Sequence, residues 1–168
     1  MDKRFQNDII VKSIWIRCHK QMTWDNMITK NGRTQDAERV VKSHVTQVLR
    51  MMNIPYTEAS SQRHGDIIID SRIILELKKT DSNTIMLNDT LPSQGAYYLI
   101  FQTKQKRILL FNGNVFDPFS KYENFKKTLR HVEELYKTNY SIPDDYPIRT
   151  YIRPNFSVNI KHIINKTL

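Results

Sequence analysis

Two runs of isoleucine separated by a short polar segment constrain the fold of this chain more than any other feature. Ile67-Ile68-Ile69 and Ile73-Ile74-Leu75 flank the tripeptide Asp70-Ser71-Arg72. Runs of β-branched residues on either side of a short turn segment are typical of a β-hairpin. The sequence therefore predicts a hairpin over residues 66–79, and the length of its connection sets the pairing of the two strands.

The predicted hairpin contains charged residues among its apolar ones. With a three-residue connection, Asp66 lies opposite Glu76, and Glu76 and Lys78 share one face about 6–7 Å apart. Two like charges placed directly opposite each other are destabilising by up to about 1 kcal/mol. Mg²⁺ would compensate them, because it takes carboxylate oxygens as ligands and fills its other positions with water and substrate phosphate. Lys78 would stand beside the ion, placed to activate a water molecule or to neutralise a phosphate.

The same three residues have a second interpretation. Asp66, Glu76 and Lys78 can lie on the solvated face of an ordinary hairpin, with Lys78 in a surface salt bridge that contributes little. The predicted register also puts Ile68 and Ile74 on that face, so the face is not simply polar, which favours a site. A slip of one residue in the register would separate the two acids.

Asp66, then nine residues, then Glu76-Leu77-Lys78 resembles the core motif of the PD-(D/E)XK nuclease superfamily, which includes many restriction endonucleases, mismatch-repair nucleases and Holliday-junction-resolving enzymes. Gly65 stands where the family often has proline. The resemblance implies that Asp66 and Glu76 are metal ligands, that the backbone carbonyl of Leu77 is a further ligand, and that Lys78 activates water. We expect Mn²⁺ to replace Mg²⁺, and Ca²⁺ to bind without supporting cleavage.

The family also commonly supplies an acid from a helix ahead of the hairpin. Apolar residues at Val41, Val45, Val48 and Met52 follow helical spacing and predict a helix over residues 34–52. Glu38 lies three residues before Val41 and extends this stripe, which makes it a candidate catalytic acid. Acids in the first turns of a helix also favour its dipole, so both interpretations of Glu38 stay open.

The charge of the chain agrees with a nucleic-acid partner. The sequence has 26 Lys and Arg against 17 Asp and Glu, a formal net charge of +9. Residues 66–118 carry six basic and six acidic groups, so the whole excess lies in the two flanking regions. Basic flanks would give salt-sensitive affinity for a phosphate backbone beside an acidic centre, although many basic proteins bind other polyanions or merely stay soluble.

The polar stretch 81–96 is expected to be a long loop that leaves the strand carrying Lys78, and long loops beside a site are usually functional or mobile. Its amide and hydroxyl side chains are candidate base or phosphate contacts, although turns favour the same residues. The candidate DNA contacts are Arg63, Lys79, Asn83, Asn88, Ser93, Gln94, Arg149 and Arg153.

The length of 168 residues suits one domain, 1–168. We expect an N-terminal helical part over 1–52, a catalytic sheet over 54–116, and a C-terminal part over 119–168. The C-terminal part would consist of a helix over about 122–138 and a tail. This order predicts an α/β or α+β fold with a mixed central sheet of four to five strands flanked by helices. The resemblance implies a restriction-endonuclease-like core.

Several classes of protein are disfavoured by the composition. Cys18 is the only cysteine, which excludes an internal disulfide and argues against a cysteine-based zinc site. The sequence has neither an apolar stretch long enough to span a membrane nor a signal-peptide core at its N-terminus. We expect a soluble protein that is not secreted and does not associate with a membrane, in the cytoplasm or another DNA-containing compartment.

These expectations converge on an Mg²⁺-dependent endodeoxyribonuclease, most similar to a small type II restriction endonuclease. Because one active site cuts one strand, double-strand cleavage would require a homodimer. Two alternatives stay open: a structure-selective nuclease such as a Holliday-junction resolvase, and a non-catalytic DNA-binding protein on a nuclease fold.

Overall fold

The structure is a computed structural model that describes residues 3–27, 34–59, 65–88, 95–115, 127–128, 130–132, 134–135, 137–141 and 156–162. Its named elements, in chain order, are α1 (Lys3–Lys20), η1 (Trp24–Met27), α2 (Thr34–Met51), β1 (Tyr56–Glu58), β2 (Ile67–Ile69), β3 (Ile73–Thr80), β4 (Thr84–Asn88), β5 (Tyr97–Gln102), β6 (Arg107–Asn112), η2 (Gly113–Val115), β7 (Phe156–Asn159) and η3 (Ile160–His162). Here η denotes a short 3₁₀ helix.

Five strands form the central sheet, in the spatial order β1-β2-β3-β5-β6. β3 and β5 run parallel, and the other neighbouring strands of this sheet run antiparallel. β4 and β7 pair separately as a two-stranded antiparallel ribbon. The expectation of a mixed sheet of four to five strands with helices is therefore confirmed.

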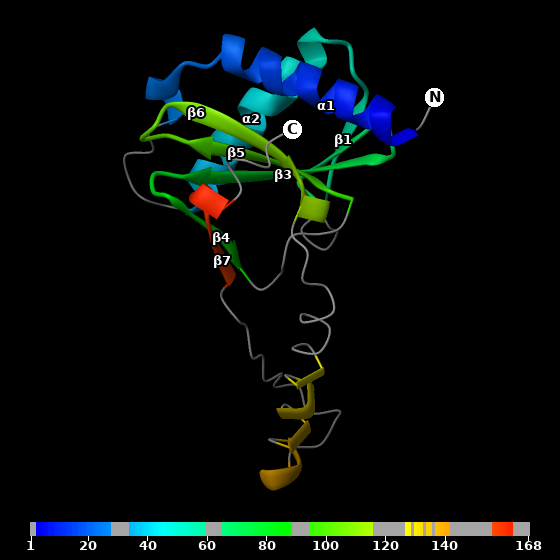
Figure 1. Cartoon of the computed structure of the whole chain (residues 1–168), viewed down its shortest axis with the longest axis vertical. Helices are drawn as coiled ribbons and strands as arrows, with labels where there is room; N and C mark the ends of the chain where they lie inside the picture. The colour runs from blue at the N-terminus through cyan, green and yellow to red at the C-terminus, as the bar shows by residue number, and fades with distance from the viewer. Residues whose placement is uncertain are drawn as a thin grey trace.

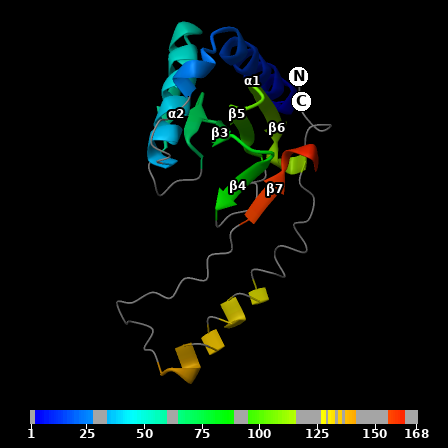
Figure 2. The same ribbon diagram turned by 90° about the vertical axis from the view of Figure 1, so that its left-hand side faces the viewer.

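The two faces of the sheet are covered differently. Figures 1 and 2 show α1 and α2 together on one face and the β4–β7 ribbon on the other. Buried residues of the helices, such as Ile14 and Val45, pack in one core cluster with Leu75 and Leu77 of β3. Ile85 of β4 belongs to a second cluster on the opposite face. β3 thus lies between two apolar layers, which limits where its charged side chains can reach solvent.

The hairpin has the predicted register. Ile67 pairs with Leu75 and Ile69 with Ile73, which leaves Asp70, Ser71 and Arg72 as the three-residue connection. Asp70 and Ser71 have φ values of 50° and 55°, in the left-handed region that aspartate tolerates better than β-branched residues do. The turn chemistry and the strand pattern therefore agree on one pairing.

The sequence-based expectation is wrong for one region, and a second expected element lies only partly within the described residues. The stretch 81–96 was expected to be a loop, which is wrong for residues 84–88, because these form β4 by pairing with β7. The described residues of the helix expected over 122–138 are helical, and the rest of that prediction lies outside the described residues. Within the described part of the chain, no helix has the length and apolar character needed to cross a membrane.

Candidate active site

Asp66 is held at the open end of the hairpin, one residue beyond the last paired residues of β2 and β3. Its backbone N–H donates to the carbonyl of Leu75 at 3.0 Å. Its carboxylate oxygen Oδ2 accepts a hydrogen bond from the backbone N–H of Leu77 at 2.7 Å. The carboxylate therefore lies against the edge of β3, where the partner strand has ended, and its orientation is fixed by the backbone.

Gly65 makes this approach possible. Its φ is 94°, and a Cβ built at this position would lie 2.6 Å from Cγ2 of Ile74. Proline fixes φ near −65°, so the proline that the nuclease motif often has before its aspartate does not fit this backbone. The departure of Gly65 from the family pattern thus has a local structural reason.

The backbone of Leu77 points toward Asp66. In a strand, the N–H and C=O of one residue point to the same side, as the exchanged hydrogen bonds of antiparallel pairs require. Because the N–H of Leu77 donates to Asp66, its carbonyl is directed to the same edge of β3. A carboxylate and a backbone carbonyl therefore share this edge of β3.

A cavity of about 370 Å³ opens at this edge, between α2 and the end of β3. It brings together Glu38 of α2, Asp66 and Lys78, three of the four candidate catalytic residues. Its remaining lining residues are Arg39, Val41, Lys42, Leu77 and Lys79. Glu38 has an exposed side chain, so it faces the opening and does not belong to the buried stripe of its helix.

Glu76 lies beside this cavity without lining it. Its Oε2 is 4.0 Å from Nζ of Lys78, and the two side chains are only 16% and 25% exposed. Ile74, two residues earlier on the same face of β3, packs against the second apolar cluster. The pair therefore differs from the solvated surface salt bridge of the alternative interpretation, because the apolar layer around it removes much of the competing water.

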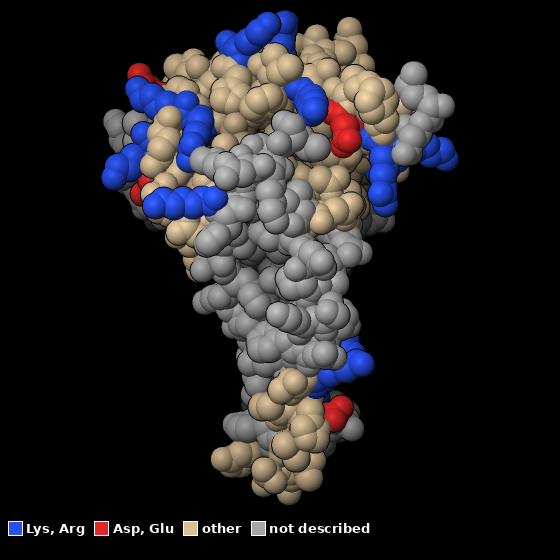
Figure 3. All heavy atoms as spheres, in the orientation of Figure 1, with Lys and Arg blue, Asp and Glu red and all other residues tan. Residues whose placement is uncertain are grey.

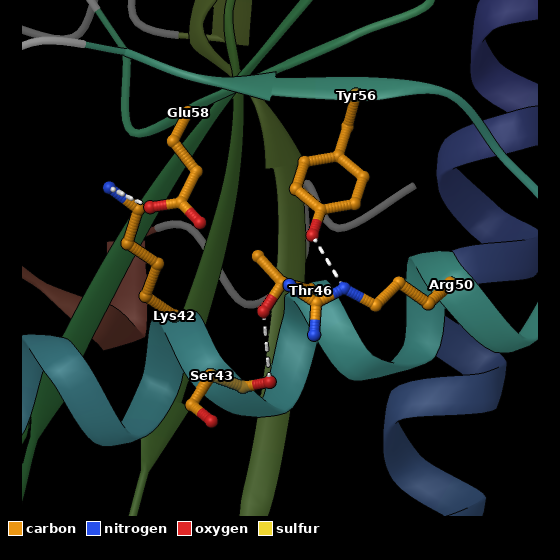
Figure 4. A network of polar contacts seen from close by, with 6 residues as sticks. All are labelled: Lys42, Ser43, Thr46, Arg50, Tyr56 and Glu58. Carbon is orange, nitrogen blue, oxygen red and sulfur yellow. Dashed lines mark hydrogen bonds and ion pairs between the residues drawn. The ribbon is translucent and has the colours of Figure 1, made fainter.

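Basic side chains dominate the wall of the cavity: Arg39, Lys42, Lys78 and Lys79 stand against the two acids. Lys42 is held by an ion pair to Glu58 of β1 at 3.2 Å. Figure 4 shows this ion pair and the parallel contact in which Nε of Arg50 donates to the hydroxyl of Tyr56. These contacts link α2 to the edge strand β1, and the ion pair holds Lys42 at the cavity wall.

Lys79 differs from an ordinary surface lysine. Burial lowers its pKa, and the negative charge of Asp81 acts in the opposite direction. A partly desolvated ammonium interacts more strongly with an approaching anion than a fully hydrated one does. This environment makes Lys79 a stronger site for an anion than a fully solvated lysine would be.

The three proposed ligands carry oxygen donors that suit a hard cation: Asp66 and Leu77 meet at this edge of β3, and Glu76 lies beside Lys78. The carboxylates of Asp66 and Glu76 and the carbonyl of Leu77 are all oxygen ligands, which Mg²⁺ prefers. Among the described residues, no group of three Asp, Glu, His or Cys side chains is arranged to hold a metal ion. Mg²⁺ is commonly bound through one or two carboxylates with water and substrate phosphate, and this donor set contains two carboxylates.

Asn83, a candidate base contact, is oriented by a buried network. The fully buried Gln102 donates through Nε2 to Oδ1 of Asn83 at 3.0 Å and to the carbonyl of Ser82 at 2.8 Å. Gln102 in turn accepts from Nε of Arg107 at 2.6 Å. The Oδ1 of Asn83 therefore accepts a hydrogen bond within the protein. The amide nitrogen of Asn83 is the group that would contact a ligand.

The other candidate DNA contacts have no described side chain. Asn88 ends β4, but only its backbone is described, and five further residues lie outside the described ranges: Arg63, Ser93, Gln94, Arg149 and Arg153.

Two residues of the cavity, Arg39 and Lys42, were not predicted from the sequence. Lys42 follows Glu38 by four positions, so the two residues lie on the same side of the helix. Helical spacing alone could therefore have predicted that Lys42 is near Glu38. Arg39 is adjacent to Glu38 and gives no such signal. A search for basic residues at helical spacing from the candidate acid would have found Lys42 alone.

Comparison with known proteins gives no family for this chain. No protein-family model matches the sequence, and no curated protein is significantly similar to it. The resemblance to the nuclease motif therefore rests on the hairpin residues themselves.

Proposed function

We propose that this protein is a metal-dependent endonuclease that hydrolyses phosphodiester bonds in DNA. The observation that carries the proposal is that Glu38, Asp66 and Lys78 line one and the same cavity. Four basic side chains, Lys78 among them, form part of its wall. A catalytic carboxylate group alone would repel a phosphodiester. Surrounding lysine and arginine offset this repulsion and give affinity for the backbone without regard to sequence.

The residues have distinct roles in the proposed reaction, an in-line attack of water on phosphorus. Mg²⁺ bound by Asp66, Glu76 and the Leu77 carbonyl would polarise the phosphate oxygens and favour deprotonation of water. The ammonium of Lys78 orients the attacking water and stabilises charge that develops on the phosphate in the transition state. The neighbouring Glu76, whose Oε2 is 4.0 Å from Nζ of Lys78, restricts the rotamers that Lys78 can adopt.

The surface charge supports a long anionic substrate. On the face shown in Figure 3, Lys and Arg side chains are spread over the body that contains the helices and the sheet, with few Asp and Glu among them. Together with the basic cavity wall, this distribution suits a polymer that contacts the protein beyond one phosphate. We propose DNA as that polymer.

We further propose that cleavage is sequence-specific and cuts both strands, as in type II restriction endonucleases. Such cleavage requires two copies of the active site, so the proposed active form is a homodimer with two-fold symmetry. Digestion of a long plasmid distinguishes this from the alternatives. Discrete, reproducible fragments support sequence-specific cleavage, and cleavage confined to four-way junctions replaces it with a junction-resolving activity.

The catalytic assignment is tested with Lys78→Ala and Asp66→Asn, assayed for Mg²⁺-dependent nicking of plasmid DNA. Each is expected to lower the rate by about 10²–10⁴-fold, the range for loss of a positioned acid–base group. Lys12→Ala and Asp25→Asn remove the same charges from exposed positions outside the cavity and serve as controls. DNA binding without any cleavage by the parent protein would instead support a non-catalytic DNA-binding role.

A further inference from the structure

A second cavity, of about 540 Å³, lies on the other side of Arg39 from the candidate active site. It is formed between the end of α1, η1 and one face of α2, and we call it the amide groove. Its polar lining residues include Gln21, Asn26, Arg39, Ser43, His44 and Gln47. Its volume falls within the range of about 300–1,000 Å³ typical of ligand pockets.

The amide groove combines an apolar base with a polar rim. Met27, which is 2% exposed, and the half-buried Val40 contribute the apolar surface. The side chains of Asn26 and Gln47 are exposed at the rim and carry both hydrogen-bond donors and acceptors. This combination fits a flat aromatic ligand whose edge carries donors and acceptors, which is the chemistry of a nucleobase.

His44 adds a neutral ring to this groove. Its Nε2 lies 3.1 Å from the carbonyl oxygen of Cys18, which can only accept, so Nε2 carries the proton. Burial lowers the pKa of His44, while the bond to Cys18 acts in the opposite direction. The ring is therefore uncharged at neutral pH, and its flat aromatic surface suits stacking on a base.

Arg39 connects the amide groove with the candidate active site, because it lines both cavities. Its guanidinium is always charged and suits a phosphate between two binding sites. A strand whose reacting phosphate lies beside Asp66 and Lys78 would thus pass Arg39 before it reaches the groove.

We propose that the amide groove binds an unstacked nucleobase, preferentially adenine, of the strand whose phosphate lies in the candidate active site. Asparagine and glutamine pair bidentately with adenine, which gives the preference. The inference rests on the proposed nuclease function, because that function supplies the strand. It makes Asn26 and Gln47 residues that determine specificity, separate from the catalytic ones.

The test measures binding of labelled single-stranded oligonucleotides by fluorescence anisotropy, with EDTA present to prevent cleavage. The probes are oligo(dA), oligo(dT) and an abasic strand of the same length. The parent protein is expected to bind oligo(dA) about tenfold more tightly than the abasic strand. Asn26→Ala and Gln47→Ala are expected to remove this preference, and Gln105→Ala, which removes an exposed amide from the β5–β6 turn, is expected to keep it.

Further variants separate this inference from the proposed function. Arg39→Ala is expected to weaken binding of all three strands alike, unlike the control Arg17→Ala on α1. Asp66→Asn is expected to lower Mg²⁺-dependent cleavage by at least about 10²-fold and to keep the preference for adenine. A parent protein that cleaves no DNA but prefers oligo(dA) contradicts the nuclease function and supports the base site.

Three results overturn the inference about the amide groove. The nuclease function is tested separately, by the plasmid-nicking assay. The first is equal binding of the three strands by the parent protein. The second is an adenine preference that survives in both Asn26→Ala and Gln47→Ala. The third is competition by adenosine monophosphate that equals that of oligo(dA) and does not depend on Arg39, which would identify a site for free nucleotides.

Discussion

Replacement of Gly65 by alanine tests how the backbone places Asp66. Two effects add at this position, because φ is 94° and the new Cβ would lie 2.6 Å from Cγ2 of Ile74. Strain in the backbone costs about 1–3 kcal/mol, and overpacking against a fixed neighbour costs about 1–3 kcal/mol more. We therefore expect Gly65→Ala to lower the free energy of unfolding by about 2–6 kcal/mol.

Gly95→Ala is the matched control for this experiment. Gly95 has a φ of 78°, but nothing lies within 4 Å of a Cβ built there, so only the backbone strain applies. Urea denaturation of both variants measures the difference. A double variant with Ile74→Ala, which removes the contacting methyl group, should recover part of the loss in a double-mutant cycle. Equal destabilisation by Gly65→Ala and Gly95→Ala would refute the steric argument.

Three other predictions follow from buried polar groups. Gln102→Leu should destabilise the protein by about 1–3 kcal/mol in urea denaturation, because it leaves the hydrogen-bond partners of a buried amide unpaired. Gln105→Leu, at the exposed β5–β6 turn, should have little effect on stability. Burial raises the pKa of the Cys18 thiol from 9.0 to about 12, and the thiolate is the form that reacts. Alkylation by iodoacetamide at pH 8 should therefore be roughly 1,000-fold slower in the folded protein than in denaturant. Similar rates in the two states would contradict this burial. The lowered pKa of His44 means that the unfolded chain binds its proton more readily, so stability is present above about pH 6.5 and falls as the pH drops below it. In His44→Gln, thermal melts across this pH range should show a smaller fall, and an unchanged profile would contradict the assignment.

The hairpin was predictable because its determinants are local. Ile67 to Leu75 contains the strand pattern and the turn, and the observed φ values of Asp70 and Ser71 agree with that turn. The helix over residues 34–51 was predictable for the same reason, since its apolar stripe repeats within the segment.

Interactions between distant segments were not predictable. β4, which contains the buried Ile85, lies within the mainly polar stretch 81–96, and it is a strand because it pairs with β7, about 70 positions later. The bond from Leu77 to Asp66 escaped prediction because strict alternation puts Asp66 opposite Glu76. The left-handed backbone at Gly65 and the hydrogen bond from the Leu77 N–H, which places the Asp66 carboxylate at the edge of β3, are not visible in the alternation pattern.

The most direct test of the central claim is the Mg²⁺-dependent cleavage of plasmid DNA by the purified protein and by its Asp66→Asn variant. The account predicts cleavage by the parent protein that stops when the metal ion is removed with EDTA and falls by at least about 10²-fold in the variant. Cleavage that is equal in the two proteins, or that persists without a divalent ion, would contradict the assignment of this cavity as a nuclease active site.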